Sequence, residues 1–279
     1  MPELPEVETI ARMLVGIHKG AAFSIIDCEI QDSLVLWEGT LANQLPDDFT
    51  ARVKNQNIRS VWRRGKFLVF TLSKDTILIH LRMSGDLRLE RVIDETGTEV
   101  PRQKHDRLVL VFTSGNRLVF NNPRKFGRVW LVSDPGEILG DLGPEPLDEA
   151  LDADRFHGLF QQHKRQLKPL LMDQHFLAGL GNIYTDEALY RAKLHPIRRS
   201  NTLTKEESAC LLDSIRFVLQ EGIRHNGASI DWVYRGGDFQ NHFNVYGRTG
   251  EPCLVCGTQI ERLVVGQRGT HICPGCQQV

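Results

Sequence analysis

The chain of 279 residues contains no long hydrophobic segment. Nothing in it approaches the run of about 18 apolar residues that a membrane-spanning helix requires. Its first residues, MPELPEVETIARML, also lack the basic stretch followed by an apolar one that directs a chain to secretion. We therefore expect a cytoplasmic protein with no membrane partner, and the length and 41% hydrophobic content predict two domains with buried cores.

The chain also lacks the basic excess that is typical of proteins that bind nucleic acid. Its formal net charge is −1. The charges are nevertheless unevenly distributed, because residues 51–67 carry six basic side chains and no acid, whereas residues 134–154 carry eight acidic side chains and no base. Runs of like charge are usually solvated faces, so this asymmetry is compatible with a DNA partner without requiring one.

Cysteine is scarce outside the C-terminal region. Cys28 and Cys210 stand alone, and the other four form two C-x-x-C pairs separated by 16 residues: Cys253, Cys256, Cys273 and Cys276. In a reducing compartment such pairs indicate metal ligands, and two pairs complete a tetrahedral four-thiolate zinc site. The alternative is four free thiols in a small hairpin. We expect one structural zinc ion, because four filled positions leave none open for chemistry, and no organic cofactor.

The run IERLVVGQRGTHI lies between the two cysteine pairs. It contains two β-like segments around Gln267, Arg268 and Gly269. It therefore predicts a zinc-held hairpin with Arg268 at its tip. Taken alone, such an arginine is more often a solvent-facing turn residue.

The pattern of apolar residues predicts an α+β protein. An N-terminal helix is indicated by Val7, Ile10, Met13 and Leu14, which share one helix face. Short β-rich runs then follow between residues 22 and 132: FSIIDCEI, SVWRRGKFLVFTL, TILIHLRMSGDLRLE, DRLVLVFTS and NRLVFNN. These runs predict a β-sandwich or a flattened barrel.

Helical segments follow an acidic region rich in glycine and proline. They are DADRFHGLFQQ, KRQLKPLLMDQ, IYTDEALYRAK and TKEESACLLDSIRFVLQEGIRHN, and Thr204 with Glu207 predicts a capping box for the last. We expect a β-domain over residues 1–134, an acidic linker over 135–150, a helical domain over 151–227 and a zinc-binding tail over 228–279.

The first residues could carry nucleophilic chemistry. Removal of Met1 would expose the secondary amine of Pro2, and an α-amino group has a pKa near about 8, so part of it is unprotonated at neutral pH. Glu3 and Glu6 lie in the first helical turn, where carboxylates are favoured and could transfer protons beside the amine. Without further context, P-E-x-P-E is simply a good helix start.

Seven motifs supply that context: MPELPEVET, RRGKF, HLRMSG, NPRKFGR, GLGNIYTDE, VYGRTGEPC and RGTHICPGCQ. Together, and in this order, they resemble the formamidopyrimidine-DNA glycosylase family across nearly the whole chain. The resemblance implies a β-sandwich followed by a helix-two-turn-helix module and a zinc hairpin. It also implies a monomeric base-excision repair enzyme, associated with the nucleoid, that acts on double-stranded DNA containing damaged bases.

The resemblance also implies the catalytic residues. Pro2 matches the amine that attacks C1′ of the damaged nucleoside, displaces the base and forms a Schiff base with the opened sugar. Glu3 matches the proton donor and acceptor, and Glu6 a supporting carboxylate. Lys66 matches the lysine associated with β-elimination, and Arg268 the arginine associated with δ-elimination, whose planar fork suits bidentate phosphate contact.

Base removal requires the nucleotide to leave the stack, and other side chains then fill the gap. Met83, Arg124 and Phe126 match the void-filling residues of the family, although lone apolar side chains such as Met83 and Phe126 are more often core residues. Further matches are DNA contacts at His105, Arg124, Lys164 and Asn182, with Lys168 one helical turn beyond Lys164, and a carboxylate near the lesion pocket at Glu187.

One departure from the family concerns the stretch between Tyr234 and Phe239. In family members that prefer 8-oxoguanine this stretch is a longer loop that closes over the everted base, whereas here only four residues intervene. We therefore expect poor 8-oxoguanine removal and better activity on ring-opened purines, further-oxidised guanine or damaged pyrimidines. The alternatives are the substrate range of the related endonuclease VIII and a non-catalytic protein that binds damaged DNA.

Overall fold

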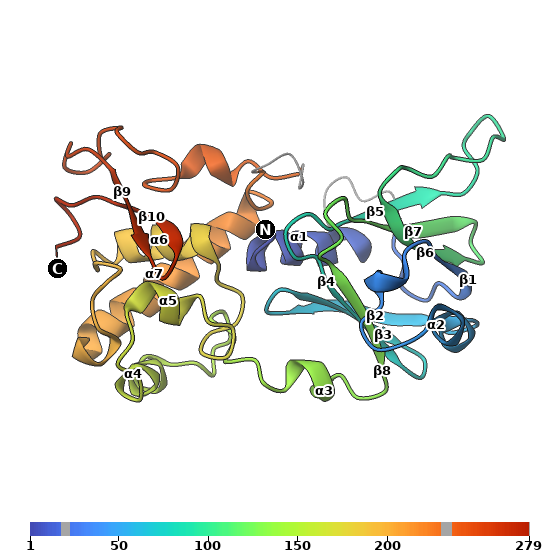
Figure 1. Ribbon diagram of the computed structural model, residues 1–279, viewed down its shortest axis with the longest axis horizontal. Coiled ribbons are helices and arrows are strands. Elements are labelled where there is room, and N and C mark those ends of the chain that lie inside the picture. The colour runs from blue at the N-terminus through green and yellow to red at the C-terminus, as the bar shows by residue number, and fades with distance from the viewer. Residues whose placement is uncertain (18–22, 230–235, 279) are drawn as a thin grey trace. The chain divides into compact units, whose positions relative to one another are not determined.

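The computed structural model describes residues 1–17, 23–229 and 236–278, which fall into two compact units (Figure 1). Within these residues, unit 1 comprises Met1–Pro2 and residues 6–140, and unit 2 comprises Glu3–Pro5 together with the chain from Asp141 onward. None of the helices in the described ranges combines the length and the apolarity needed to cross a bilayer.

Unit 1 is built around two four-stranded antiparallel sheets. One has the strand order β1-β6-β7-β5 and the other β2-β3-β4-β8. The strands are β1 (Ile30–Val35), β2 (Ile58–Arg64), β3 (Phe67–Leu72), β4 (Thr76–His80), β5 (Asp86–Arg91), β6 (Asp106–Phe112), β7 (Asn116–Asn121) and β8 (Arg128–Val132). A single hydrophobic core joins side chains from both sheets. This arrangement confirms the predicted β-sandwich.

Two helices complete this core. Helix α1 (Leu4–Leu14) buries Val7, Ile10 and Leu14, as the predicted apolar face requires. Helix α2 (Pro46–Val53) buries Phe49 and Val53. The N-terminal helix is therefore an integral part of the sandwich core.

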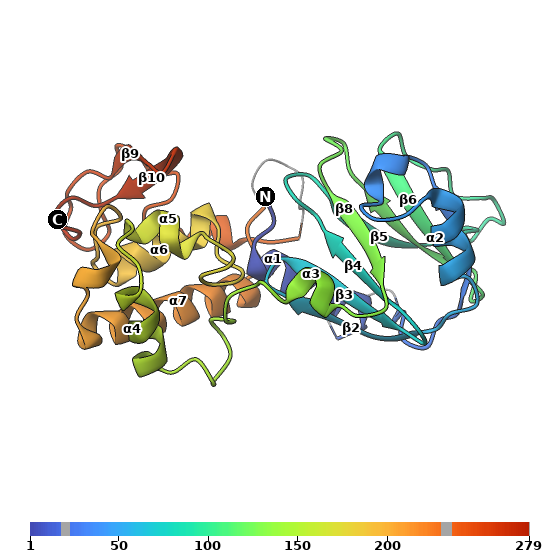
Figure 2. The same ribbon diagram turned by 60° about the horizontal axis from the view of Figure 1, so that its bottom comes forward.

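Unit 2 is helical apart from one hairpin. Its helices are α4 (Ala153–Gln161), α5 (Leu167–Leu171), α6 (Asn182–Arg191) and α7 (Lys205–Arg224), with short 3-10 turns η2 (Ser200–Thr202) and η3 (Phe239–His242). Helix α7 packs against α4 and α6, and the predicted capping box of Thr204 and Glu207 is present. Strands β9 (Glu261–Val265) and β10 (Arg268–Ile272) form the predicted hairpin, and β10 contacts α6 (Figures 1 and 2).

The secondary structure departs from the sequence prediction in three places. Residues 23–29 do not form a strand, because the chain turns at Asp27, whose φ is 60°, and β1 begins only at Ile30. Helix α2 and strand β8 were not predicted. The acidic segment 135–150 contains a short helix, α3 (Gly136–Leu139), and the two units divide after Gly140.

Asp106, the first residue of β6, connects the edge strand β5 to the loop that precedes β6. Its carboxylate accepts hydrogen bonds from Arg88 at 3.1 and 3.3 Å, from Asn121 Nδ2 at 2.8 Å and from the backbone N–H of Gln103 at 2.7 Å. Burial raises the pKa of Asp106, but the hydrogen bonds from Arg88, Asn121 and Gln103 outweigh it, so the pKa lies below its usual value. The ionised form of Asp106 therefore stabilises the folded state.

We expect Asp106→Asn to lower the free energy of unfolding by about 1–3 kcal/mol at pH 7, because the Arg88 guanidinium loses the closer of its two carboxylate partners, Asp106 and Glu90. A carboxylate whose pKa is lower in the folded state contributes stability above the unfolded pKa of about 3.9 and loses it as pH falls further. Urea unfolding at pH 7 and pH 3 measures both effects, with exposed Asp47→Asn as the control. This role would be contradicted if the wild type and Asp106→Asn differed in free energy of unfolding by the same amount at pH 3 as at pH 7.

Candidate functional site

The carboxylate of Glu3 is held by the N-terminus of α6. Its Oε2 atom accepts a hydrogen bond from the N–H of Gly181 at 2.6 Å, and its Oε1 atom accepts one from Ile183 at 3.0 Å. The N–H of Leu4 donates to the carbonyl of Gly179 at 3.1 Å. These backbone amides and the helix dipole favour a negative charge at Glu3. The glycine-rich GLGN turn therefore binds a carboxylate of the protein itself.

Gly181 is required by this contact. A Cβ atom at this position would lie 2.3 Å from Cδ of Glu3, a distance that no real Cβ contact shows. Glu3 is only 2% exposed, so its carboxylate has little room to move away. Pro2, its neighbour in the chain, is also buried, whereas Met1 is exposed, and Glu6 is buried in the first turn of α1.

Lys66 lies in the tight turn between β2 and β3, in unit 1. Gly65 has a φ of 56°, and the Lys66 side chain that follows it is buried. His80 pairs with Phe67, the next residue, in the β3–β4 register, and its ring packs edge-on against Phe67 with centroids 4.8 Å apart. The sequence prediction overlooked His80, although the HLRMSG motif begins with it.

His80 is uncharged at neutral pH. Burial, together with the nearby positive charges of Arg82 and Lys66, lowers the pKa of His80 to about 3. Its Nδ1 atom accepts a hydrogen bond from the N–H of Arg82 at 3.0 Å, which places the imidazole proton on Nε2. The neutral ring therefore adds no positive charge beside Lys66.

Arg268 begins strand β10 of the zinc-associated hairpin and is exposed. The two turn residues, Gly266 and Gln267, have φ values of 55° and 64°, as a two-residue type I′ hairpin turn requires. A Cβ at Gly266 would lie 2.7 Å from Pro169, so the turn packs directly on α5. The hairpin is thus fixed at its tip, beside Arg268.

Lys168 was predicted to contact DNA, and the structure contradicts this. Its side chain is fully buried, and its Nζ atom donates hydrogen bonds to Asp186 Oδ1 at 2.6 Å and to the carbonyl of Gly269 at 3.0 Å. Burial lowers the pKa of Lys168, and Asp186 opposes this effect. Lys168 also lies within α5, whereas Lys164 is exposed in the loop before it, so the two do not share a helical turn.

Asp186 links the same hairpin to α6. Its Oδ2 atom accepts a hydrogen bond from the N–H of His271 at 2.9 Å, while Oδ1 binds Lys168. Asn182, at the start of α6, donates from Nδ2 to the carbonyl of Gly269 at 3.1 Å. These three side chains hold the backbone next to Arg268, so Lys168 supports the arginine and is not presented to a ligand.

Glu187, predicted to lie near a lesion pocket, contacts the backbone of a later segment of the chain. It is buried, and its carboxylate accepts hydrogen bonds from the N–H groups of Asn244, Val245 and Tyr246 at 2.9–3.1 Å. The Asn244 side chain adds another at 2.9 Å. Glu187 therefore anchors the backbone of the VYGR segment to α6.

Met83, Arg124 and Phe126 lie on two neighbouring loops of unit 1. Met83 is 43% exposed and Phe126 is 51% exposed, so the alternative that they are core residues is wrong. The Arg124 guanidinium lies 5.7 Å from the centre of the Phe126 ring. The N–H of Arg124 donates to the hydroxyl of Ser84, the residue after Met83, at 3.2 Å. The loops are therefore coupled, and both present their side chains to solvent.

His105 lies beside the same loops. Its carbonyl accepts a hydrogen bond from the N–H of Asn122 at 2.8 Å, and the Asn122 side chain accepts another from Ser84 at 3.1 Å. A Cβ at Gly127 would lie 2.7 Å from the Asn122 amide nitrogen, so this loop can close only around glycine. The segments that carry His105, Arg124, Met83 and Phe126 are thus joined through Ser84 and Asn122.

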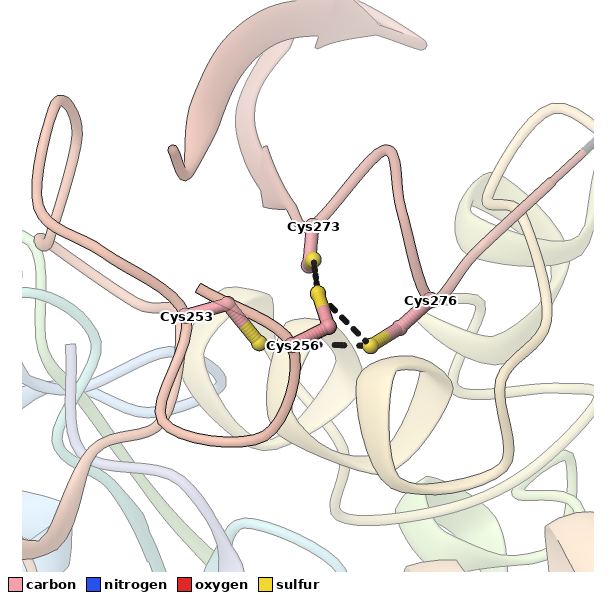
Figure 3. A group of neighbouring side chains, drawn as sticks. All are labelled: Cys253, Cys256, Cys273 and Cys276. Carbon is pink, nitrogen blue, oxygen red and sulfur yellow. Dashed lines mark hydrogen bonds between the residues drawn. The ribbon is translucent and has the colours of Figure 1, made fainter. Parts of the chain in front are cut away.

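The four predicted zinc ligands converge on one point (Figure 3). Their sulfur atoms are separated by 3.9 Å between Cys253 and Cys276, by 3.4 Å between Cys256 and Cys273, and by 3.5 Å between Cys256 and Cys276. Tetrahedral zinc with Zn–S bonds of about 2.3 Å requires sulfur separations of about 3.8 Å. The donor set and its spacing fit one structural zinc ion.

Tyr190 supports this zinc site from α6. Its hydroxyl lies 3.2 Å from Sγ of Cys253. Burial and the neighbouring cysteine sulfur raise the pKa of Tyr190, so the hydroxyl keeps its proton and donates it to the thiolate. The zinc site is thus attached to the helix whose N-terminus binds Glu3.

These features define a class of proteins in which a β-sandwich with an N-terminal helix precedes a helical unit and a four-cysteine zinc hairpin. Three family models match in this order: the formamidopyrimidine-DNA glycosylase N-terminal domain at residues 1–129, the helix-two-turn-helix domain of that enzyme at residues 142–233, and a zinc finger found in that enzyme and in IleRS at residues 250–279.

Individual proteins give the same result. The formamidopyrimidine-DNA glycosylase of Protochlamydia amoebophila is 42% identical over the full length of both chains, and that of Herpetosiphon aurantiacus is 40% identical over 99% of this chain and 100% of the relative. A Lactococcus lactis Fpg (MutM) bound to DNA containing N7-benzyl-Fapy-dG is 35% identical and matches with a TM-score of 0.89 over 100% of both chains. The chain belongs to the formamidopyrimidine-DNA glycosylase family.

We expect Lys168→Met to lower the free energy of unfolding by about 3–5 kcal/mol, because it leaves the buried charge of Asp186 without its ammonium partner. The double variant Lys168→Met/Asp186→Leu removes both charges and should recover much of this loss. The matched control is Lys205→Met, which breaks an exposed pair with Asp154 and should cost less than about 1 kcal/mol. Denaturant unfolding of the variants measures these differences, and equal losses for Lys168→Met and Lys205→Met would refute the buried pair's role.

Proposed function

We propose that this protein is a base-excision repair glycosylase that removes ring-opened and other oxidised purines from double-stranded DNA and then cleaves the abasic strand. Family membership over the whole chain supports this function. So do relatives that bear the name formamidopyrimidine-DNA glycosylase and solved structures of Fpg bound to damaged DNA. The observation that carries the proposal is the carboxylate of Glu3, fixed by two backbone amides next to Pro2 in the chain.

The proposed nucleophile is the secondary amine of Pro2, released when Met1 is removed. Its nitrogen lone pair attacks C1′ of the damaged nucleotide, the bond from C1′ to the base breaks, and the base leaves with a proton. The sugar ring then opens, and Pro2 and C1′ are joined by an iminium bond. Glu3 is the proposed donor and acceptor of the protons that these steps move, and Glu6 supports it.

Strand cleavage follows from the iminium. Loss of a proton from C2′ expels the 3′ phosphate by β-elimination, and a second elimination expels the 5′ phosphate. We assign Lys66 to the first elimination and to phosphate contact. Arg268 is assigned to the second, and its exposed guanidinium on a hairpin held by Lys168 and Asp186 suits a bidentate phosphate contact.

Recognition of the damaged duplex is assigned to side chains of both units. Met83 and Phe126 would fill the space of the everted nucleotide, and Arg124 would hydrogen-bond the orphaned base. His105, Lys164 and Asn182 are the proposed further DNA contacts. We propose that the protein acts as a monomer on DNA in the cytoplasm, at the nucleoid.

The proposed domain roles follow the sequence boundaries. Residues 1–134 would be the catalytic domain, 135–150 the linker, 151–227 the helix-two-turn-helix domain and 228–279 the zinc-finger tail. The family models and the named relatives favour formamidopyrimidine-DNA glycosylase over an endonuclease VIII substrate range. Retention of Pro2, Glu3, Lys66 and Arg268 argues against a non-catalytic DNA-binding protein.

We expect borohydride to trap a covalent complex between the protein and a duplex that contains a formamidopyrimidine lesion, because reduction converts the iminium into a stable amine. A tag fused directly before Pro2 should abolish trapping, because it converts the amine into an amide. The control is the same protein after proteolytic removal of the tag so that Pro2 is the first residue. Denaturing gel electrophoresis of labelled DNA measures the yield, and full trapping with the tag in place would exclude Pro2.

Gly181 provides a separate test of Glu3, in which the rate of base release is measured on the same lesion-containing duplex. Gly181→Ala places a methyl group where the Glu3 carboxylate lies, so we expect at least about a hundredfold loss in the rate of base release, as for removal of a proton-transfer group. The matched control is Gly158→Ala in α4, where a Cβ meets nothing within 4 Å and activity should be unchanged. Equal rates for the two variants would contradict the assigned role of Glu3.

The preferred lesion is a separate prediction. Four residues separate Tyr234 from Phe239, and Tyr234 and Arg235 lie outside the described residues, so this prediction depends on chain length alone. We expect single-turnover excision of formamidopyrimidines to be at least about tenfold faster than that of 8-oxoguanine, because the short stretch offers little surface to cover the everted base. A preference for 8-oxoguanine in matched duplexes would contradict it.

A further inference from the structure

Two histidines and an aspartate meet where α7 ends. His225 is the C-cap residue of α7, Asp238 is the N-cap residue of η3, and His242 is the last residue of η3. The Nδ1 atom of His225 lies 2.9 Å from Oδ1 of Asp238, and the rings of His225 and His242 have centroids 3.9 Å apart. One donor atom from each of the three side chains lies within 4.8 Å of the others. The three groups are therefore close enough to share one ion.

The backbone holds these groups in place. The N–H of Asp238 donates to the carbonyl of His225 at 3.0 Å, which joins η3 to the end of α7. Phe239, the next residue, is buried, and its ring stacks on Tyr184 of α6 with centroids 5.3 Å apart and planes 7° apart. The N–H of Phe239 donates to the carbonyl of Gly227 at 3.0 Å. The three ligands are thus carried by a fixed scaffold, so little chain entropy is lost when they bind an ion.

We propose that His225, Asp238 and His242 form a second metal site, which binds a divalent transition-metal ion such as Ni²⁺, Co²⁺ or Zn²⁺. Imidazole nitrogen is the donor that these ions prefer, and a carboxylate completes a two-histidine, one-carboxylate set with positions left open for water. Mg²⁺ and Ca²⁺ require mainly oxygen ligands and do not fit this set. The site shares no ligand with the four cysteines.

The surroundings of the site favour a cation. The carboxylate of Glu221 lies 4.0 Å from Nε2 of His225, where it adds negative charge, although it is also paired with Arg224 at 3.0 Å. Asp238 and His242 are exposed, so an ion and its water ligands can reach the site from solvent. Because its ligands come from α7 and η3, a bound ion would cross-link the two elements and stabilise unit 2.

The test uses the full chain with zinc already bound to the four cysteines. Ni²⁺ is titrated by isothermal calorimetry, because it binds thiolate sites less tightly than Zn²⁺ and should leave the zinc in place. We expect one additional ion per chain and a rise in the thermal unfolding temperature on nickel addition. His242→Ala and Asp238→Asn should each weaken nickel binding at least about tenfold, since even changes around the ligands of a metal cost about 10–100-fold.

The matched control is His175→Ala, which removes an exposed histidine of the same unit outside the cluster. It should bind nickel as the wild type does. Zinc content and the unfolding temperature without nickel verify that every variant is folded. We expect both to match the wild type, because His242 and Asp238 are exposed. The proposal is overturned if the wild type binds no extra ion, if His242→Ala and His175→Ala bind equally well, or if nickel uptake releases an equal amount of zinc.

Discussion

The contact between the Glu3 carboxylate and the N-terminus of α6 determines much of the surrounding sequence. Two backbone amides occupy one oxygen each, so the carboxylate cannot turn without losing a hydrogen bond inside the protein. The close approach excludes any side chain at position 181 and thereby accounts for a glycine at this point of the GLGN motif. A residue 178 positions away in the chain thus fixes the start of the polypeptide, and with it the position of Pro2 next to Glu3.

The same helix also organises the hairpin that carries Arg268. Its first residue, Asn182, and its buried Asp186 bind the hairpin backbone, and Tyr190 in its last turn contacts a zinc ligand. Zinc fixes the base of the hairpin, and the Lys168–Asp186 pair fixes the strand beside Arg268. A long charged side chain at a turn is normally mobile, so this double attachment restricts the backbone below the guanidinium and leaves only the side chain to adapt to the phosphate that we propose it binds.

The features that the sequence predicted well are those with local signals. The apolar face of α1, the capping box of α7 and the cysteine spacing each depend on residues a few positions apart, and all three were confirmed. Lys168 was misread because its partners, Asp186 and Gly269, are distant in the chain, and the contacts of Glu187 with residues 244–246 had no local signal for the same reason. A lysine or glutamate is normally exposed, and no local pattern reveals a buried ion pair. Residues 23–29 had strand-like composition, but Asp27 turns the chain there.

Met83 and Phe126 show the opposite exception, because they are apolar side chains exposed to solvent, whereas Lys168 and Glu187 are charged side chains that are buried. An apolar side chain in solvent forgoes burial worth about 1.5–3 kcal/mol, so the fold does not require Met83 or Phe126 to be apolar. The two loops that carry them are nonetheless rigid, because Ser84 and Asn122 join them and Gly127 closes one of them. Loops that are joined internally while they present apolar groups outward suit the contact with DNA that we propose for them. Under the proposed function these two side chains, flanked by an arginine, would enter the stacked interior of DNA where a base has left it.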